Sequence, residues 1–190
     1  MNRLRYSVFF IYMSGHSKWS QIKHKKAATD AKKGQIYGKV ARMITIAARE
    51  KGPDPNTNPA LRVAIEKARN ENMPSDNIER AIKRAAGKDT ESLAEVMFEA
   101  YGPGGAAILI SGITDNVNRT SQEVKHILAE NGAKLAGQGS AKFLFQKTQD
   151  GWQAMNIMQI DHATKEQLTK LFEALDENDD VQDIYSNADL

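Results

Sequence analysis

The chain changes character once, at Gly87-Lys88-Asp89. Up to Lys88, apolar residues recur at helical spacing, and 19 Lys+Arg stand against 7 Asp+Glu, a net charge of +12. From Asp89 onward, short apolar runs indicate strands, and 7 Lys+Arg stand against 17 Asp+Glu, a net charge of −10. The overall charge of +2 therefore conceals two halves of opposite charge and different secondary structure.

The basic half predicts a series of helices. An apolar face over residues 36–47, with Lys39 and Arg42 on its other side, predicts a helix that ends at Gly52-Pro53-Asp54-Pro55. A second apolar face runs from residue 61 to residue 68. Asp76-Asn77-Ile78-Glu79 has the form of a capping box, which predicts a third helix that begins at Asp76. We expect this half to be a helical domain.

The second half predicts strands and helices in alternation. The turn Gly102-Pro103-Gly104-Gly105 lacks the Lys and Ser/Thr of a P-loop, so we interpret it as a hairpin turn. Helices are expected over 120–128 and 168–175, and strands over 95–101, 106–113, two short runs within 134–145, 155–160 and 181–185. The fold class is therefore α+β, with a helical domain followed by an antiparallel-rich, ferredoxin-like α/β sandwich. The expected divisions are 1–12 (an extension), 13–88 and 89–190.

Composition excludes several classes of protein. The chain has no cysteine, which excludes disulfides and cysteine-based sites and fits the cytosol. No apolar run approaches the roughly 18 residues that would cross a bilayer. Arg3 and Arg5 precede a short apolar stretch over 8–13, for which two interpretations stay open. One is a mitochondrial presequence, and the other is an upstream start codon with the working protein beginning at Met13.

The strongest functional signal is a cluster of six lysines between residues 18 and 33, against one acid, Asp30. Charge this concentrated is typical of proteins that bind polyphosphates, although a charge run is more often a solvated face. Trp19 lies within the cluster and suits either stacking on a base or packing against the next helix. His16 and His24 lack further converging ligands, so we expect contact with phosphate or bases and no metal site.

The second half contains two further charged features, a helix start with an arginine and a run of acids. Arg119 stands at a predicted helix start beside Asn116 and Asn118, where backbone N–H groups favour phosphate. Capping alone explains the asparagines, so Arg119 is the candidate for binding. The acidic run over 176–180 lacks the spacing of a calcium loop and is interpreted as a solvated turn that repels nucleic acid.

Several long stretches resemble one known family. They read GHSKWSQIKHKKAATDAKKGQIYGK, NPALRVAIEKARNENMPSDNIERAIKRAAG, EAYGPGGAAILISGITDNVNRTSQEVKHILAENG and, at the end, LFEALDENDDVQDIYSNADL. The chain closely resembles the YebC/PmpR family. The family is commonly described as transcriptional regulators, and its mitochondrial relatives activate translation of cytochrome oxidase mRNA. The resemblance thus implies a nucleic-acid-binding protein.

One departure from the family pattern stands out. Family members usually carry a further α+β domain between the strand that ends near Phe145 and the final helix. Here only residues 146–162 bridge that gap. We expect that this third domain is missing and that the rest of its host domain is intact.

Together these observations predict a cytoplasmic, non-enzymatic regulator of gene expression with no cofactor. The expected partner is promoter DNA or, alternatively, ribosomal RNA with an association with ribosomes; a membrane partner is not expected. A nuclease is the remote alternative, because clustered carboxylates or a histidine base are not evident. The candidate contact residues are His16, Lys18, Trp19, Lys23, His24, Lys25, Lys26, Lys32, Lys33, Lys39, Arg42, Arg80, Lys83, Arg84 and Arg119.

Overall fold

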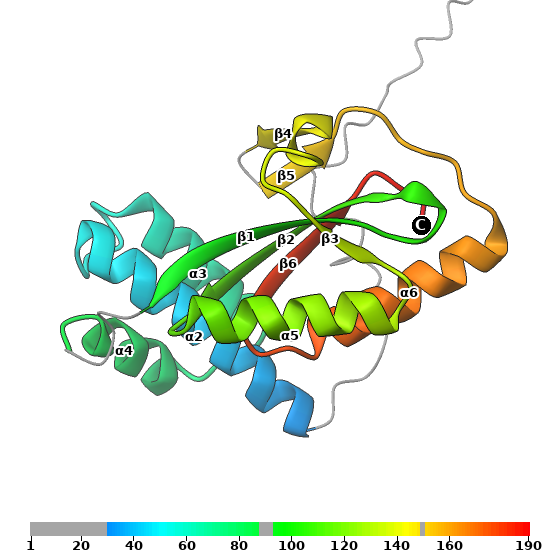
Figure 1. Cartoon of the computed structure of the whole chain (residues 1–190). Coiled ribbons are helices and arrows are strands. Elements are labelled where there is room, and N and C mark those ends of the chain that lie inside the picture. The colour runs from blue at the N-terminus through cyan, green and yellow to red at the C-terminus, as the bar shows by residue number, and fades with distance from the viewer. Residues whose placement is uncertain (1–29, 88–92, 149–150) are drawn as a thin grey trace, which may run out of the picture.

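A computed structural model describes residues 30–87, 93–148 and 151–190 of the chain. Figure 1 shows two parts, which we call the helical lobe (residues 30–87) and the α+β lobe (residues 93–190). Three helices form the first lobe, and a sheet with two long helices and a small hairpin forms the second. The change of period near residue 88 thus coincides with the passage from one lobe to the other.

The helical lobe consists of α2 (Asp30–Lys51), α3 (Pro59–Asn70) and α4 (Ser75–Arg84). Asn58 determines the turn between the first two helices. Its side-chain oxygen accepts a hydrogen bond from the Leu61 N–H, and its amide donates to the carbonyls of Ala47 and Gly52. Asn58 is completely buried, so losing its side chain would leave three backbone groups without partners.

The apolar faces of these helices meet in one core. Ile44 of α2 and Leu61 and Ala68 of α3 are fully buried there, and Ile78 of α4 joins them. The capping box expected at Asp76 is wrong. The N-cap is Pro74, two residues before Asp76, and its carbonyl accepts the first hydrogen bonds, from the N–H groups of residues 77 and 78; helix α4 therefore begins at Ser75.

The α+β lobe is built on a four-stranded antiparallel sheet in the order β3-β1-β2-β6. Its strands are β1 (Ala94–Tyr101), β2 (Ala107–Thr114), β3 (Lys134–Ala136) and β6 (Val181–Ser186). The short 3₁₀ helix η2 (Pro103–Gly105) joins β1 to β2, as expected for a hairpin turn. Elements around the sheet run β-β-α-β-α-β, in place of the β-α-β-β-α-β order of the ferredoxin-like fold.

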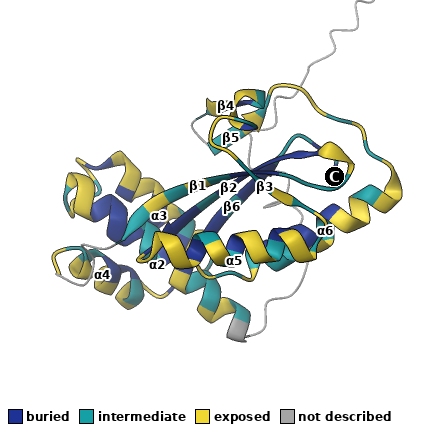
Figure 2. Cartoon of the chain, in the orientation of Figure 1, coloured by how far each residue is buried: buried dark blue, intermediate teal, exposed yellow. Residues whose placement is uncertain are grey.

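Both faces of this sheet are covered. Helices α5 (Val117–Glu130) and α6 (His162–Asp176) lie against one face, where Val124, Leu128 and Phe172 bury themselves on Ile108 and Ile110 (Figure 2). The hairpin of β4 (Phe145–Thr148) and β5 (Gly151–Ala154) lies against the other. The expected class, a helical part followed by an α+β sandwich, is confirmed.

Two expected strands differ from the structure. Residues 134–145 do not form two paired strands, because only β3 joins the sheet and the chain then turns around the carboxylate of Glu99. That buried carboxylate accepts hydrogen bonds from the N–H groups of Gly139, Ala141 and Lys142, and η3 (Lys142–Leu144) follows. Residues 155–160 contain a single bridge, Met158 with Ala188, instead of a strand.

The final strand and helix pack as the sequence predicts. Strand β6 pairs with β2, and Leu168, Leu171, Phe172 and Leu175 of α6 are fully buried in one core with Val124 and Leu128 of α5. The closing segment therefore completes both the sheet and its helical layer.

Truncating Phe172 tests how far the fold depends on α6. We expect Phe172→Ala to lower the free energy of unfolding by about 3–5 kcal/mol, the usual cost of a large-to-small change in a core. Phe143→Ala is the matched control, because the Phe143 side chain is 63% exposed and its loss should cost about 0.5 kcal/mol or less. Equal urea midpoints for the two variants would show that α6 does not carry the core.

Candidate nucleic-acid interface

The described structure accounts for eight of the candidate contact residues. Helix α2 carries Lys32, Lys33, Lys39 and Arg42, helix α4 carries Arg80, Lys83 and Arg84, and helix α5 carries Arg119. The other seven lie outside the described residues: His16, Lys18, Trp19, Lys23, His24, Lys25 and Lys26. Six of the eight form two groups, one between the lobes and one on the surface of the helical lobe, with Arg42 in both. Lys32 and Lys33 lie in the first turn of α2.

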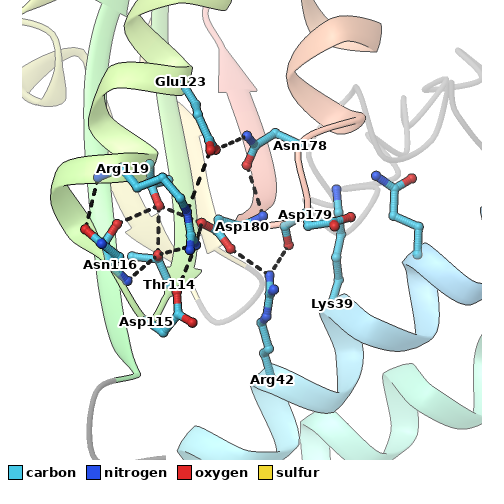
Figure 3. A network of polar contacts seen from close by, with 12 residues as sticks. Lys39, Arg42, Thr114, Asp115, Asn116, Arg119, Glu123, Asn178, Asp179 and Asp180 are labelled. Carbon is cyan, nitrogen blue, oxygen red and sulfur yellow. Dashed lines mark hydrogen bonds and ion pairs between the residues drawn. The ribbon is translucent and has the colours of Figure 1, made fainter.

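The first group joins α2 to the loop between α6 and β6. Lys39 donates a hydrogen bond to the Asp176 carbonyl at 2.6 Å and lies 3.4 Å from the Asp176 carboxylate. One turn later, Arg42 donates to the Asp179 carbonyl and to the Asp180 carboxylate, the latter at 2.9 Å (Figure 3). On the same helix, Gln35 donates to the Glu177 carbonyl at 2.6 Å. One face of α2 therefore binds the acidic loop through hydrogen bonds and ion pairs.

Asp180 is the centre of this contact. One carboxylate oxygen accepts from Arg42, and the other accepts from Arg119 at 2.7 Å and from the Thr120 hydroxyl at 2.6 Å. Figure 3 shows the two guanidinium groups approaching the same carboxylate from α2 and α5. The Asp180 side chain is only 4% exposed. Three elements from both lobes therefore meet at one buried charge.

The surroundings of Asp180 keep it ionised. Burial opposes the charge, but the hydrogen bonds from Thr120 and Arg119 and the nearby charge of Arg42 outweigh burial and lower the pKa of Asp180 below its ordinary value. The interpretation of residues 176–180 as a solvated turn is therefore wrong at Asp180. The cations that neutralise Asp180 lie 61 and 138 residues away in sequence, so the local run of acids does not reveal them.

Three of the candidate contact residues take part in these interactions between the lobes. Lys39 is 7% exposed, and Arg42 and Arg119 are directed at Asp180. Arg119 also pairs with Asp115 at 2.8 Å and with Glu123 at 3.6 Å. These side chains lie in ion pairs of the protein itself, and a phosphate would have to compete with carboxylates for them.

The second group lies along a groove between α2 and α4. The groove has a volume of about 800 Å³ and continues to Leu93 and Asp115 of the α+β lobe. Arg42, Arg80 and Arg84 are three arginines of its lining, and of these the Arg42 guanidinium is directed at Asp180. Its remaining lining comprises Tyr37, Gly38, Ala41, Thr45, Met73, Asn77 and Ala81. The groove is therefore lined by cationic and apolar residues together.

The arginines of the groove differ in how they are held. Arg80 donates to the Asp76 carbonyl and to the side-chain oxygen of Asn77, so α4 itself fixes its direction. Arg84 is exposed, and its side chain makes no hydrogen bond or ion pair with another described residue. Lys83, on the same helix, is 80% exposed and lies 3.9 Å from Glu79. The groove residues Tyr37, Gly38 and Asn77 were missed by sequence reasoning.

The remaining shifted carboxylates have structural partners. The pKa of Glu99 is lowered, because its three backbone hydrogen bonds and Lys142 outweigh the effect of burial. The Asp161 side chain accepts from the Thr164 N–H at the start of α6, and this bond lowers its pKa. Across residues 30–87, 93–148 and 151–190, no three His, Asp or Glu side chains converge on a metal site. No helix in these ranges is both long and apolar enough to span a membrane.

Comparison with known proteins agrees with the resemblance seen in the sequence. A model of the TACO1/YebC protein N-terminal domain matches residues 17–88, and a model of the TACO1/YebC second and third domain matches residues 93–150 and 146–188. The chain belongs to the TACO1/YebC family. A TACO1/YebC relative from Petrotoga mobilis is 55% identical over 136 residues, which are 71% of this chain and 54% of that protein. The matched segment thus spans about half of that relative.

Two further relatives cover almost the whole chain. A Rubrobacter xylanophilus protein is 35% identical over an alignment of 240 positions, which covers 94% of this chain and 96% of that protein. It and the Petrotoga protein are described as probable transcriptional regulatory proteins. The crystal structure of a conserved hypothetical protein from Aquifex aeolicus superposes with a TM-score of 0.80 at 34% identity, covering 91% of this chain and 97% of that one. This chain therefore shares its fold with the Aquifex protein.

Removing the Asp180 carboxylate tests the contact between the lobes. We expect Asp180→Ala to lower the free energy of unfolding by about 2–4 kcal/mol, because two cations and a hydroxyl lose their partner while the arginines keep some contact with water. Amide hydrogen exchange should also quicken at the Arg42 face of α2. Asp179→Ala is the control, because it removes the same charge from the same loop and keeps the Asp179 carbonyl that Arg42 uses.

The pH dependence of stability follows from the lowered pKa of Asp180. The pKa of Asp180 is lower in the folded protein than its ordinary value of 3.8. The ionised carboxylate therefore stabilises the fold at pH values above 3.8, and this contribution is lost as the pH falls through the pKa of the folded state. The wild type should therefore lose more stability below pH 4 than Asp180→Asn does. Parallel acid limbs in urea titrations of the two proteins would contradict the role of Asp180.

Proposed function

We propose that the protein is a non-enzymatic regulator of gene expression that binds nucleic acid through its helical half. The main support for this proposal is the separation of charge along the chain, with a net charge of +12 up to Lys88 and −10 beyond it. Phosphate contacts dominate the affinity of proteins for nucleic acids and require such a concentration of cations. The exposed cations of α4 and the arginine-lined groove add to the lysine cluster before residue 34.

DNA is the first candidate partner. Several TACO1/YebC relatives are described as probable transcriptional regulatory proteins, which supports a role at promoters. Lysine contacts with phosphates position a protein on a duplex and do not read its sequence. We therefore propose backbone-driven binding to DNA in the cytoplasm, with the α+β lobe holding α2 in place through Asp180.

Ribosomal RNA is the second candidate partner. The family includes mitochondrial activators of translation, and lysine-rich helices fit an RNA backbone as well as a DNA backbone. The groove between α2 and α4 favours this candidate, because sequence-specific RNA recognition relies on unpaired bases that need such a hollow. Sedimentation with ribosomes, before and after nuclease treatment of the lysate, separates the two candidates.

The salt dependence of binding tests the electrostatic basis of the proposal. If Lys18, Lys23, Lys25, Lys26, Lys32 and Lys33 contact phosphates, log affinity should fall against log salt with a slope of about −4 to −5, from about 0.7–0.9 per contact. Replacing Lys23, Lys25 and Lys26 by alanine should make the slope shallower by about 2–3.

The control replaces lysines of the acidic half. Lys125, Lys134 and Lys165 are exposed there, and changing them to alanine should leave the slope unaltered. Titrations with duplex DNA and with structured RNA, followed by fluorescence anisotropy, give both slopes. A slope near zero for both nucleic acids would refute the proposed function.

A further inference from the structure

The groove between α2 and α4 has the size of a small-molecule site. Ligand pockets span roughly 300–1,000 Å³, and this groove holds about 800 Å³. A duplex keeps its bases stacked inside and its phosphates outside, so it can touch only the rim of such a hollow. The groove can admit a base only when that base lies outside a stack.

The lining of the groove matches the two parts of a nucleotide. Ala41, Met73 and Ala81 are apolar residues of its lining, the kind of surface that the flat face of a base contacts. Arg80 and Arg84 on α4 supply planar cations at the wall, which bind phosphate in bidentate fashion and also stack on bases. Tyr37 is held in place because its hydroxyl donates to the Asn72 carbonyl at 2.8 Å.

Two glycines keep this side of α2 open. Gly34 and Gly38 are one turn apart inside the helix, where glycine costs about 1 kcal/mol relative to alanine. A Cβ at either position would meet no described atom within 4 Å, so internal packing does not require glycine there. Gly34 and Gly38 both line a smaller neighbouring hollow with Lys39 and Asp179, but only Gly38 of the two also lines the groove.

From these observations we infer that the groove binds an unpaired nucleotide, so that the protein prefers single-stranded or looped nucleic acid to a continuous duplex. The inference rests on the proposed function and specifies its ligand. The lysine cluster supplies affinity for any phosphate backbone, and the groove supplies the preference for an unpaired base.

A pair of glycine variants tests the inference without any change of charge. Gly38→Leu adds a side chain at a residue that lines the groove, and Gly34→Leu adds the same side chain one turn away, at a residue that does not line it. A Cβ at either position meets no described atom within 4 Å, and leucine favours a helix over glycine, so both variants should fold with a melting temperature at or above that of the wild type. Four fluorescent probes are titrated by anisotropy: a short single strand and a blunt hairpin of the same sequence, each as DNA and as RNA.

The expected result is selective. Gly38→Leu should weaken binding of the single strands about tenfold and binding of the hairpin stems less than about twofold, the scale expected for losing one stacked base. Gly34→Leu should bind all four probes as the wild type does. Comparing the DNA and RNA probes shows which sugar the groove accepts.

Other outcomes separate the two proposals. If the wild type binds strands and stems with steep salt dependence but Gly38→Leu matches Gly34→Leu on every probe, the groove inference is wrong and the proposed function stands. Equal losses on strands and stems for Gly38→Leu also reject the inference. If the wild type binds none of the four probes, both proposals are refuted.

Discussion

The carboxylate of Asp180 joins two lobes that otherwise have separate interiors. Each apolar cluster among the described residues belongs to a single lobe, and the contact of α2 with the acidic loop is polar. Directional contacts join the lobes: Arg42 to Asp180 and Lys39 to Asp176 from α2, and Lys67 of α3 to Asp183 at 3.5 Å. Such ion pairs fix the geometry of the contact, and removing one partner leaves the other charge buried without a counter-charge, which lowers the free energy of unfolding. The groove in turn depends on this placement, because Arg42 belongs to both contacts.

Local pattern predicted most of the fold. The faces that contain Ile44, Leu61 and Phe172 are periodic within their own helices, so these elements could be predicted without tertiary information. The failures have non-local causes. Residues 155–160 are apolar enough for a strand, but Met158 contributes only one bridge because the chain crosses the end of β6 there. The turn after β3 is organised by Glu99, a residue about 40 positions earlier.

The sequence predicted which cationic residues belong to the candidate site, but it did not predict where their side chains point or that a groove forms. Concentrated lysines are visible in a linear count, and Arg80 and Arg84 follow from the outer face of α4. The inward direction of Lys39 and Arg42 could not be predicted, because their acidic partners lie 137 and 138 residues away. The groove itself arises where α2 and α4 cross, so no single segment contains its pattern. Glycines at helical spacing were its one visible trace in the sequence.

The path from β5 to α6 has a consequence for engineering. Gly151 lies so close over the Tyr185 ring that an added Cβ would approach its hydroxyl to 2.5 Å, which fixes the hairpin on the sheet. A few residues later, the Met158 N–H donates to the Asn187 carbonyl at 2.7 Å and fixes the chain again. Residues 155–157 between these anchors expose Met155 and Ile157 and carry no part of the core. A fluorescent reporter with closely spaced termini could be grafted there, and the sheet would hold both of its ends.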